Sequence, residues 1–563
     1  MSRKQPNDRL HRRALFKLAS AGAGAAALPA ILPDQALAAP AWNEEADVVI
    51  AGYGGAGACA AIEAHDAGAK VLILEKQPQA THYPNTRIAA GAVFSADPAG
   101  DKAAMATYAE AIMSGDNLPW MLEGQEPDIA KDIAAAWAKY EPENIQFLQK
   151  LDPDFKPVAM GPEGVEDFPG FAAAKDRLFF ASYTGKVDFG RSTKDLPKNQ
   201  KMMGEALFAC MNNGVTTRKN IRLAYETPVQ SLVTDASGQV TGVVAQQKGK
   251  PIRIKARRGV VITTGGYEFN AHLRAAFLDG PTRDGYAFYG TDANRGEGIV
   301  MALRAGASLL KAGELSGGLI AAVPTRANGL RMGVSINAIG APNSIVVNNL
   351  GKRYFDESEA ASATYFYYHE GAKFDIKTRS YPEIPSWLVF DETLRKRGPM
   401  AVGSFGSVGY GWVPWTPDNM DAINRGWILK ADSIDELASK IQGEHDNRKQ
   451  MTADALKAAV QRFNDSCAKG TDDLGRKLQA SAAIATPPYY ALALYIGGPN
   501  TSGGLYANAD REVLDWDGKP IPRLFAAGEI ASLFKYVGSA HLSECIVCGR
   551  IAGKNAAALK AWG

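Results

Sequence analysis

Residues 47–76 read DVVIAGYGGAGACAAIEAHDAGAKVLILEK, and this stretch decides the fold of the 563-residue chain. Two short apolar runs, at residues 48–51 and 71–74, flank an alanine-rich segment. Each run has the length and composition of a buried strand, and the segment between them is long enough for a helix. The stretch therefore predicts a strand–helix–strand unit that opens a Rossmann-type α/β domain.

The glycines of this unit explain why it suits a nucleotide. Gly52, Gly54 and Gly57 follow the first run in the pattern G-x-G-x-x-G, and Glu75 follows the second run. Gly52 permits a tight turn, Gly54 lets the backbone approach a pyrophosphate, and Gly57 lets the helix pack on the strand. The helix N-terminus would face the phosphates, and Glu75 would accept hydrogen bonds from a ribose. We therefore predict a dinucleotide site, with an ordinary glycine-rich turn as the alternative.

The composition, with 46% hydrophobic and 22% charged residues, is that of a soluble globular protein, and the length favours two or more domains. The formal net charge of +2 arises at the N-terminus, where residues 1–38 hold six Lys or Arg and two Asp. The rest of the chain is nearly neutral, which argues against nucleic acid as a partner.

Residues 1–38 have the organisation of an export signal. The charged segment HRRALFK at 11–17 precedes a run rich in Leu, Ala and Gly, and Ala36-Leu37-Ala38 supplies a small-residue cleavage site. The pair Arg12-Arg13 resembles the twin-arginine type of signal peptide. We expect a mature protein in the periplasm without stable membrane insertion; a basic tail with no signal function is the alternative.

The five cysteines are Cys59, Cys210, Cys467, Cys545 and Cys548. Their odd number and wide scatter do not suggest a disulfide framework. Cys545 and Cys548 form C-x-x-C, but no His follows, so this is not a c-type haem motif. We expect this pair to pack within a helix, and we predict no metal site.

Hydrophobic patterning organises the rest of the chain. Residues 102–155 read as amphipathic helices, 221–247 as alternating strands and 258–264 as another buried strand. The irregular, aromatic and then helical segment that follows favours an inserted second domain. The predicted division is a first domain over 45–314, an insert over 315–480 and a return to the first domain over 481–563.

Further motifs follow the first unit in a fixed order. They are Asn85-Thr86-Arg87-Ile88-Ala89-Ala90-Gly91, Thr263-Thr264-Gly265-Gly266, Thr501-Ser502-Gly503-Gly504, Leu524-Phe525-Ala526-Ala527-Gly528-Glu529 and Gly549-Arg550-Ile551-Ala552-Gly553. This order resembles the flavoprotein family of fumarate reductase and succinate dehydrogenase, over about residues 45–560. The family includes soluble flavocytochrome c fumarate reductases, urocanate reductase and 3-ketosteroid dehydrogenases. The resemblance implies a Rossmann-type discontinuous FAD-binding domain with an inserted α+β capping domain, and a substrate between the two.

The resemblance also implies which residues contact FAD. The implied contacts are Gly52, Gly54, Gly55, Gly57, Glu75, Lys76, Asn85, Thr86, Ala90, Gly91, Val229, Thr264, Gly265, Gly528, Glu529, Ser543, Cys545 and Ile546. The last three begin a helix whose positive end would stabilise charge on the reduced flavin. In the respiratory branch a His binds the flavin covalently. Because Asn85 stands nearest to that position, with His82 three residues before it, we expect dissociable FAD.

The substrate-binding residues of the family are largely missing. The position of its proton-delivering Arg, beyond the motif Gly351-Lys352-Arg353-Tyr354, aligns with Ala361, and its carboxylate-clamping Arg aligns with His541. Since a dicarboxylate needs guanidinium partners, fumarate and succinate are poor candidates. The remaining residues favour an apolar or aromatic substrate that carries a carbonyl, such as a steroid-like enone.

Three residues are candidates for acid–base catalysis. Tyr495 precedes two glycines in the segment where ketosteroid dehydrogenases place a catalytic Tyr. Tyr365 lies one helical turn beyond Ala361, and His541 occupies the clamp position. Each of the three can instead be a packed or hydrogen-bonded residue. Candidate substrate contacts are Gly497, Gly498, Asn500 and Tyr368.

The predicted function is that of an FAD-dependent oxidoreductase acting on a C=C or CH–CH bond next to a carbonyl, with hydride exchanged at flavin N5. The C-x-x-C-H haem motif is absent from the sequence, so we expect a separate electron carrier or acceptor. The sequence does not determine the direction of the reaction. The alternatives are an oxygen-using flavin oxidase and an exported flavin-binding protein without turnover.

Overall fold

The structure is a computed structural model that describes residues 41–114, 129–160, 168–175, 177–184, 203–278, 280, 285–358, 370–534 and 538–562. The predicted export signal at 1–38 lies outside these residues. The candidates Tyr365 and Tyr368 and the aligned position Ala361 lie outside them as well.

The first sheet has eight strands and contains both apolar runs of the opening motif. Its main path is β17 (Glu512–Leu514), β18 (Pro520–Ala526), β9 (Lys250–Ile262), β1 (Glu44–Ala51), β2 (Val71–Leu74) and β6 (Ile221–Ala224), and β8 (Val240–Gln247) and β7 (Val229–Thr234) continue from β9. β1 pairs in parallel with both β2 and β9, with Val48 opposite Val71 on one side and Val49 opposite Val260 on the other. Because both faces of β1 are covered, its apolar residues are consecutive rather than alternating.

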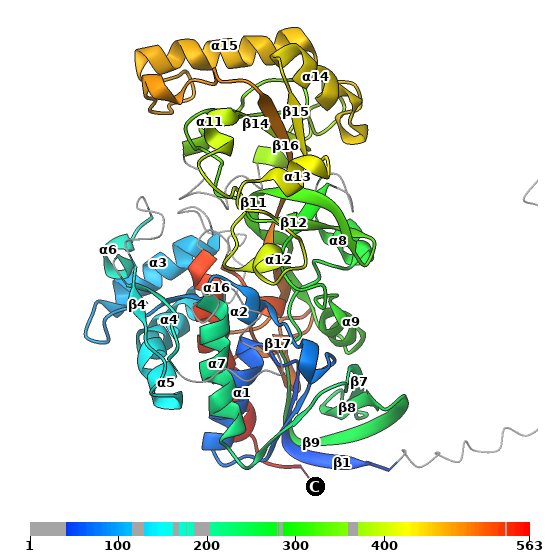
Figure 1. Ribbon diagram of the computed structural model, residues 1–563. Helices are drawn as coiled ribbons and strands as arrows, with labels where there is room; N and C mark the ends of the chain where they lie inside the picture. Colours follow the sequence, from blue (N-terminus) through cyan, green and yellow to red (C-terminus); the bar gives the residue numbers. More distant parts are fainter. Residues whose placement is uncertain are drawn as a thin grey trace, which may run out of the picture. The chain divides into compact units, whose positions relative to one another are not determined.

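One face of this sheet is covered by α1 (Gly55–Asp66), α7 (Met203–Thr216) and α16 (Gly538–Ala558), as Figure 1 shows. α1 and α16 meet backbone to backbone. A Cβ atom on Gly549 would lie 2.5 Å from the carbonyl oxygen of Ala56, and one on Gly553 would lie 2.1 Å from that of Ala60. These matched contacts make the two helices parallel, so the first turns of α16 extend beyond the start of α1.

The second sheet has seven strands and is held together by one long strand pair. Its strands are β10 (Tyr286–Phe288), β11 (Leu309–Ala327), β12 (Leu330–Val334), β13 (Ser344–Val347), β14 (Ser386–Asp391), β15 (Ile428–Ala431) and β16 (Tyr489–Leu505). β11 and β16 pair antiparallel from Leu309 opposite Leu505 to Ala321 opposite Leu494, and the first half of β16 pairs with β14 and β15. In Figure 1, β16 runs from β14 and β15 down towards β17. The sheet combines β12–β15, which lie within the predicted insert 315–480, with β10 and β16, which lie outside it. The predicted domain division stays a prediction.

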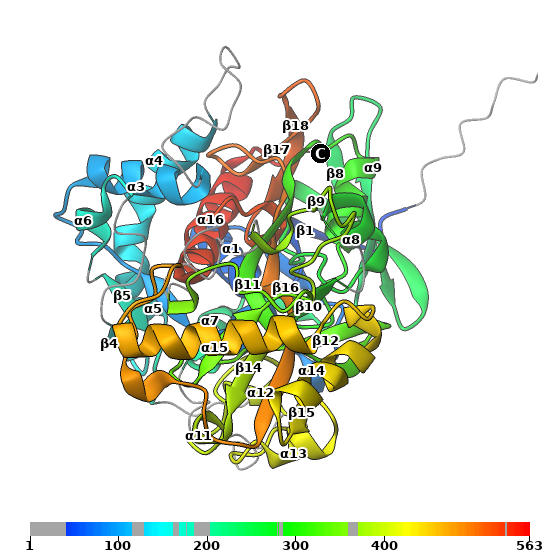
Figure 2. The same cartoon turned by 90° about the horizontal axis from the view of Figure 1, so that it is seen from above.

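Helices α14 (Ile434–Gly443) and α15 (Ala453–Lys469) cover the second sheet, as seen from above in Figure 2. Their buried residues Leu437 and Leu456 belong to the same apolar cluster as Ile345 and Trp387 of the sheet.

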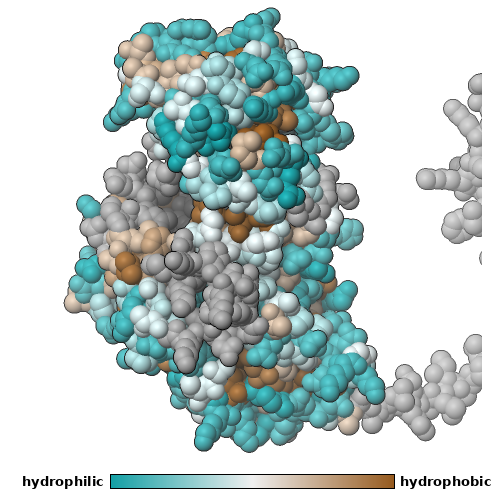
Figure 3. Space-filling model, in the orientation of Figure 1, coloured by the Kyte–Doolittle hydropathy of each residue, from teal (hydrophilic) through white to brown (hydrophobic). Residues whose placement is uncertain are grey.

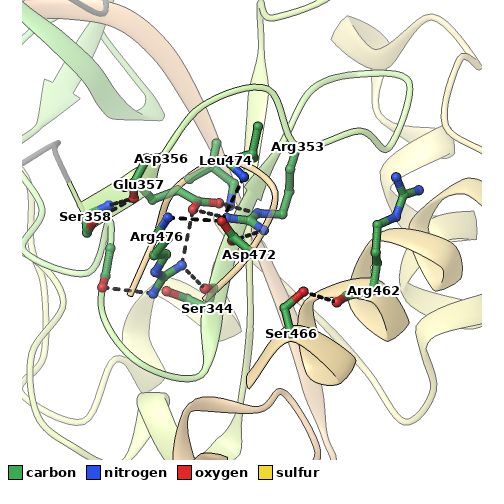
Figure 4. A network of polar contacts seen from close by, with 12 residues as sticks. Ser344, Arg353, Asp356, Glu357, Ser358, Arg462, Ser466, Asp472, Leu474 and Arg476 are labelled. Carbon is green, nitrogen blue, oxygen red and sulfur yellow. Dashed lines mark hydrogen bonds and ion pairs between the residues drawn. The ribbon is translucent and has the colours of Figure 1, made fainter. Parts of the chain in front are cut away.

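A buried ion-pair network binds the segment after β13 to the segment after α15 (Figure 4). Arg353, from the motif Gly351-Lys352-Arg353-Tyr354, makes two bonds to Glu357 of 2.8 and 2.5 Å and one to Asp472 of 2.6 Å. Arg476 lies 3.2 Å from Glu357 and also donates to the carbonyl of Ser344. The arginine of this motif is therefore structural.

A third, small sheet consists of β3 (Ala92–Phe94), β5 (Leu178–Phe180) and β4 (Val158–Ala159). The helices α3 (Lys102–Ser114), α4 (Ile129–Tyr140) and α5 (Asn144–Leu151) lie in the region 102–155 that was predicted to be helical, and the short helix α6 (Phe171–Ala174) follows it. The short helices elsewhere are α2 (Asn85–Ile88), α8 (Ala271–Phe277), α9 (Glu297–Arg304), α11 (Glu392–Arg395), α12 (Gly406–Gly409) and α13 (Met420–Asn424).

On the face drawn in Figure 3, hydrophilic residues cover much of the described surface, and smaller hydrophobic patches lie between them. Within the described ranges, no helix has the length and apolar character needed to cross a membrane. All five cysteines are free thiols.

The contact between α1 and α16 should not tolerate a side chain. We expect Gly553→Val to lower the free energy of unfolding by about 1–3 kcal/mol or more, because overpacking forces the two backbones apart. Thermal unfolding of the FAD-free protein measures the effect. Gly443→Ala is the control, since a Cβ atom there has no neighbour within 4 Å. Equal melting temperatures for the two variants would contradict the backbone contact.

Candidate active site

The loop between β1 and α1 forms part of the wall of a cavity of about 330 Å³. The cavity brings together most of the cofactor contacts that the sequence predicted. Those in its lining are Gly52, Gly54, Gly55, Glu75, Lys76, Asn85, Thr86, Val229, Thr264, Gly265, Gly528, Glu529 and Cys545.

Two glycines make this loop possible. Gly52 has a φ of +104°, and a Cβ atom there would lie 2.5 Å from the carbonyl oxygen of Thr263. A Cβ atom on Gly57 would lie 2.3 Å from the carbonyl oxygen of Gly52, so Gly57 is needed for the turn although it does not line the cavity. The N-cap residue Gly54 has no side chain to cap α1. The start of α1 is therefore suited to a phosphate.

The surroundings of Glu75, directly after β2, favour an ionised carboxylate that can accept hydrogen bonds. The backbone N–H groups of Tyr53 and Gln77 donate to its carboxylate at 2.9 and 2.7 Å, and His82 Nε2 lies 3.7 Å away. Burial opposes ionisation, but His82 and these two N–H groups outweigh it and lower the pKa of Glu75. An ionised Glu75 fits the ribose contact that the sequence predicted.

His82 lies behind Glu75 and does not line the cavity. Its ring stacks on Tyr53, with 5.3 Å between centroids and 9° between planes, and it packs on Phe208 and Tyr225. Asn85, by contrast, lies in the cavity wall. The structure therefore gives His82 an aromatic environment rather than a contact with the flavin position.

Two further groups fit FAD. Thr264 Oγ1 is buried and has no hydrogen-bond partner among the described residues, although it belongs to a residue of the cavity wall. Buried hydroxyls normally have a partner, and a bound cofactor would supply one. Lys76 is also in the cavity wall, and its Nζ donates to the carbonyl of Ala293 and to Glu297, which joins the end of β2 to the start of α9. The donor and acceptor set of this cavity thus fits FAD.

A pair of buried carboxyl groups, Glu268 and Glu529, lies beside the cavity. The side-chain amide of Asn85 donates to both at 3.0 Å, and that of Asn294 donates to Glu268 at 2.9 Å and to Glu529 at 3.1 Å. Burial raises the pKa of Glu268, and burial together with the charge of Glu268 raises that of Glu529. Since two adjacent buried carboxylates repel each other, the pair holds a proton.

A second cavity, of about 250 Å³, adjoins the first and shares Asn85, Thr86, Glu529 and Cys545 with it. The predicted contacts Ala90 and Gly91 line this second cavity. Its aromatic residues are Phe180, Tyr289 and Phe405, and its polar side chains include Asn500, His541 and Glu544. Among the described residues in this wall, none is Arg or Lys.

His541 stands in the first turn of α16 with one ring nitrogen unpaired. Nδ1 lies 3.3 Å from Ser532 Oγ, while Nε2 is buried and has no hydrogen-bond partner in the described ranges. Burial lowers the pKa of His541 to about 4. The imidazole is therefore neutral near pH 7, able to donate or accept a proton at Nε2.

Tyr495 does not line the second cavity with His541. Its hydroxyl donates to Asp446 Oδ2 at 2.5 Å, and the guanidinium of Arg331 lies 4.5 Å from the centre of its ring. Burial and the carboxylate of Asp446 raise the pKa of Tyr495, against the opposing charge of Arg331. Tyr495 lines neither of the two cavities. Its catalytic role therefore stays a prediction.

Gly497 and Gly498 also lie outside the linings of both cavities. They belong to β16, where they pair with Ala287 and Phe288 of β10, and Gly498 accepts from the N–H of Tyr289. A Cβ atom on Gly497 would lie 1.6 Å from the carbonyl oxygen of Ala287. Close strand packing thus explains these glycines without a substrate contact.

Of the three predicted contacts at the start of α16, only Cys545 reaches a cavity. Ser543 Oγ accepts from the N–H of Phe94 at 2.7 Å, and Ile546 is buried in the core between α1 and α16. Sequence reasoning missed Tyr289, Phe405, Ser532 and Glu544, which are close to the site only in the folded chain. For one of them, Glu544, the sequence did offer a signal, because it stands next to the predicted contact Cys545 in the predicted helix.

Comparisons with known proteins agree with this site. The family model described as "FAD binding domain" matches residues 47–539. Digoxin reductase of Eggerthella lenta is 26% identical, over 92% of this chain and 88% of its own length. NADH:fumarate oxidoreductase of Klebsiella pneumoniae is also 26% identical, and this chain spans 47% of its length. A 3-oxosteroid 1-dehydrogenase of Mycobacterium tuberculosis is 28% identical, over 60% of this chain and 59% of its own length.

Solved structures show the same fold. The 3-ketosteroid delta1-dehydrogenase of Sterolibacterium denitrificans superposes with a TM-score of 0.74 and 23% identity, covering 92% of this chain and 100% of that one. A flavocytochrome c3 fumarate reductase superposes with a TM-score of 0.62 and 21% identity, over 92% of this chain and 78% of that one. These matches confirm the predicted fold class, a Rossmann-type FAD-binding domain with a capping domain.

The family and its members also confirm the prediction of FAD as cofactor and of an oxidoreductase acting on a CH–CH group. The family model matches residues 47–539, which include the glycine-rich turn and Glu75, and this match leads to one assignment: the chain belongs to the FAD-binding family of fumarate reductases and 3-oxosteroid dehydrogenases.

Proposed function

We propose that this enzyme exchanges hydrogen with a C–C bond next to a carbonyl in a largely apolar substrate, and that the second cavity receives the carbonyl-bearing end. The observation that carries this proposal is the wall of that cavity. It combines Phe180, Tyr289 and Phe405 with a neutral imidazole, and its described residues include no Arg or Lys. A dicarboxylate would find no cationic partner among the described residues of this wall.

Two relatives support a substrate of this kind, because their names specify a 3-oxosteroid and digoxin. A ring system with one ketone matches an aromatic wall that carries a few polar groups. A substrate of the fumarate type has less support, although another relative is named for fumarate.

Residues of the first cavity would bind the cofactor, and residues of the second would bind the substrate and exchange its proton. Bound FAD supplies the hydride-exchange chemistry, and we propose that it is bound non-covalently, because Asn85 stands in the wall and His82 does not. The turn at Gly52 would seat the pyrophosphate, and Glu75 would hold the ribose. His541 Nε2 and the amide of Asn500 would face the substrate carbonyl or the carbon beside it.

A direct test uses purified protein with its flavin reduced anaerobically. Unsaturated ketones should reoxidise the flavin, and fumarate should do so far more slowly. Reoxidation by oxygen alone, with peroxide as product, would instead favour the oxidase alternative. A flavin that cycles with none of these compounds would favour a binding protein without turnover.

Removing one hydroxyl should weaken FAD binding without harming the fold. We expect Thr264→Val to raise the Kd for FAD by up to about tenfold, the value of one lost hydrogen bond. The melting temperature of the FAD-free protein should not fall, since Oγ1 has no described protein partner. Flavin fluorescence titration and thermal unfolding measure the two effects.

Thr263→Val is the matched control for this prediction. Thr263 Oγ1 donates to the carbonyls of Ala51 and Gly52 at 3.1 and 2.9 Å, so its loss should lower stability before FAD is added. The cofactor contact of Thr264 is disproved if Thr264→Val binds FAD as tightly as the natural protein.

The two acid–base candidates that the structure describes can be separated by mutation. We expect His541→Gln to slow turnover by about 100-fold or more, as for loss of an acid–base group, with FAD binding retained. Tyr495→Phe should keep turnover within a few-fold, because its hydroxyl is engaged by Asp446. Stopped-flow reoxidation of the reduced flavin gives both rates. The reverse order of effects would favour Tyr495 as the acid–base residue.

We also propose that residues 1–38 direct export to the periplasm and that a separate carrier or acceptor exchanges electrons with the flavin. Replacing Arg12 and Arg13 by Lys should leave uncleaved, FAD-loaded precursor in the cytoplasm, because the paired arginines identify the twin-arginine signal. Cell fractionation with detection of the mature form measures this, and normal periplasmic accumulation would argue against that route.

A further inference from the structure

Behind His541 lies a chain of polar groups that the proposed chemistry has not used. Ser532 Oγ lies 3.3 Å from His541 Nδ1 and donates to Glu544 Oε2. The other oxygen of Glu544 accepts from the N–H of Leu533 at 3.2 Å. Ser532 and Glu544 are both buried. Three side chains from two segments thus form one continuous path that ends at Nε2 of His541.

The end of this path is the second observation. Nε2 is buried without a hydrogen-bond partner among the described residues, and His541 lines the second cavity. An unpaired ring nitrogen beside a cavity is a costly arrangement unless a ligand completes it. The opposite end of the path is a carboxyl group able to hold a proton.

We propose that Glu544, Ser532 and His541 form a proton relay that delivers a proton to, or takes one from, the substrate in the second cavity. The relay rests on the proposed function, because a C–C bond that gains or loses a hydride must also gain or lose a proton. His541 is its catalytic residue, and Ser532 and Glu544 are positioning residues that act through it.

The relay has two arrangements that differ by one proton. When Glu544 is ionised, Ser532 O–H donates to it, His541 Nδ1–H donates to Ser532, and Nε2 is a free base. When Glu544 is protonated, it donates to Ser532, Ser532 donates to Nδ1, and Nε2 carries hydrogen. The protonation state of Glu544 therefore selects the tautomer that His541 presents to the cavity.

The proton step balances in both directions. In reduction, the Nε2–H bond breaks as a C–H bond forms at the substrate carbon beside the carbonyl. Nδ1 takes the proton of Ser532, Ser532 takes that of Glu544, and Glu544 becomes a carboxylate. Dehydrogenation reverses each transfer, and no imidazolium remains in the buried site.

The charges around Glu544 suit this role. Burial raises its pKa to about 7, against Arg511 and the hydrogen bonds from Ser532 and Leu533 N–H. The thiols of Cys545 and Cys548 also face it, and burial raises the pKa of both, so they remain neutral. Glu529 lines the same cavity as His541. Glu544 can thus change protonation near neutral pH while His541 stays neutral.

The test compares the natural protein with Glu544→Gln and Ser532→Ala in the FAD-loaded state. Reduction of an unsaturated ketone needs protonated Glu544, so its rate should fall as the pH rises through about 7. Glu544→Gln should lose this dependence and be slower by about 10–100-fold, within the range for acid–base groups. Ser532→Ala should be slowed similarly, and it guards against a folding defect in the first variant.

Glu141→Gln is the matched control. Glu141 is another buried glutamate of raised pKa, held by the N–H of Ala96 and outside both cavities. This variant should keep the rate and the pH dependence of the natural protein. The relay is wrong if Glu544→Gln retains the pH dependence, or if Glu141→Gln loses it.

A second readout separates the relay from the proposed function. Nitrogen NMR of ¹⁵N-histidine-labelled protein should show His541 changing from the Nε2–H to the Nδ1–H tautomer as Glu544 ionises, with no such change in Glu544→Gln. If this change occurs but no unsaturated ketone reacts, the relay stands and the proposed substrate class fails. If the ketones react and the tautomer does not change, the relay fails and the function stands.

Discussion

The close contact between α1 and α16, where Gly549 and Gly553 meet the backbone of α1, sets the relative position of the two ends of the site. Gly549 and Gly553 bring the two helix backbones together at Ala56 and Ala60, so the helices run parallel at close distance. α1 starts at the glycine-rich turn of the first cavity. Because α16 begins further out, its first turns carry His541 and Cys545 to the second cavity. One packing constraint thus aligns the nucleotide end of the site with the reacting end.

The part of the site that motif spacing alone predicts is local in the chain, whereas distant contacts such as Val229, Thr264 and Glu529 were implied only by the family resemblance. Strand, turn, helix and acid occur within residues 47–76, and their spacing is dictated by backbone geometry, so Gly52 and Glu75 were found without a structure. The residues around the second cavity have no such regular spacing in the sequence. Tyr289, Phe405 and the pair Ser532 and Glu544 come from three segments far apart in the sequence, and only the folded chain brings them together. Tyr495 illustrates the limit, since its neighbours Asp446 and Arg331 are set by the same sheet and no sequence spacing predicts them.

Between the two cavities, Asn85 and Asn294 solve an electrostatic problem. Glu268 and Glu529 are buried side by side, and the two amides donate to both. One proton shared by the pair avoids two adjacent negative charges in a low-dielectric region. An amide at position 85 is well matched to this task because it cannot itself become charged, whereas a histidine there would add a third titrating group. Asn85, which stands nearest to the position of the covalent His in the respiratory branch, therefore holds the carboxyl pair in place.

The chemistry of the second cavity follows from what burial does to His541. An arginine in its place would remain charged and would attract a carboxylate. A buried imidazole with a pKa of about 4 is neutral, so a carboxylate entering the cavity would gain no ion pair unless the ring took up a proton at a cost. A ketone requires only a hydrogen-bond donor at its oxygen or a proton at the neighbouring carbon, and neutral Nε2 can provide either. A neutral imidazole in place of a permanent charge therefore supports the substrate proposed above, an apolar carbonyl compound, over a dicarboxylate.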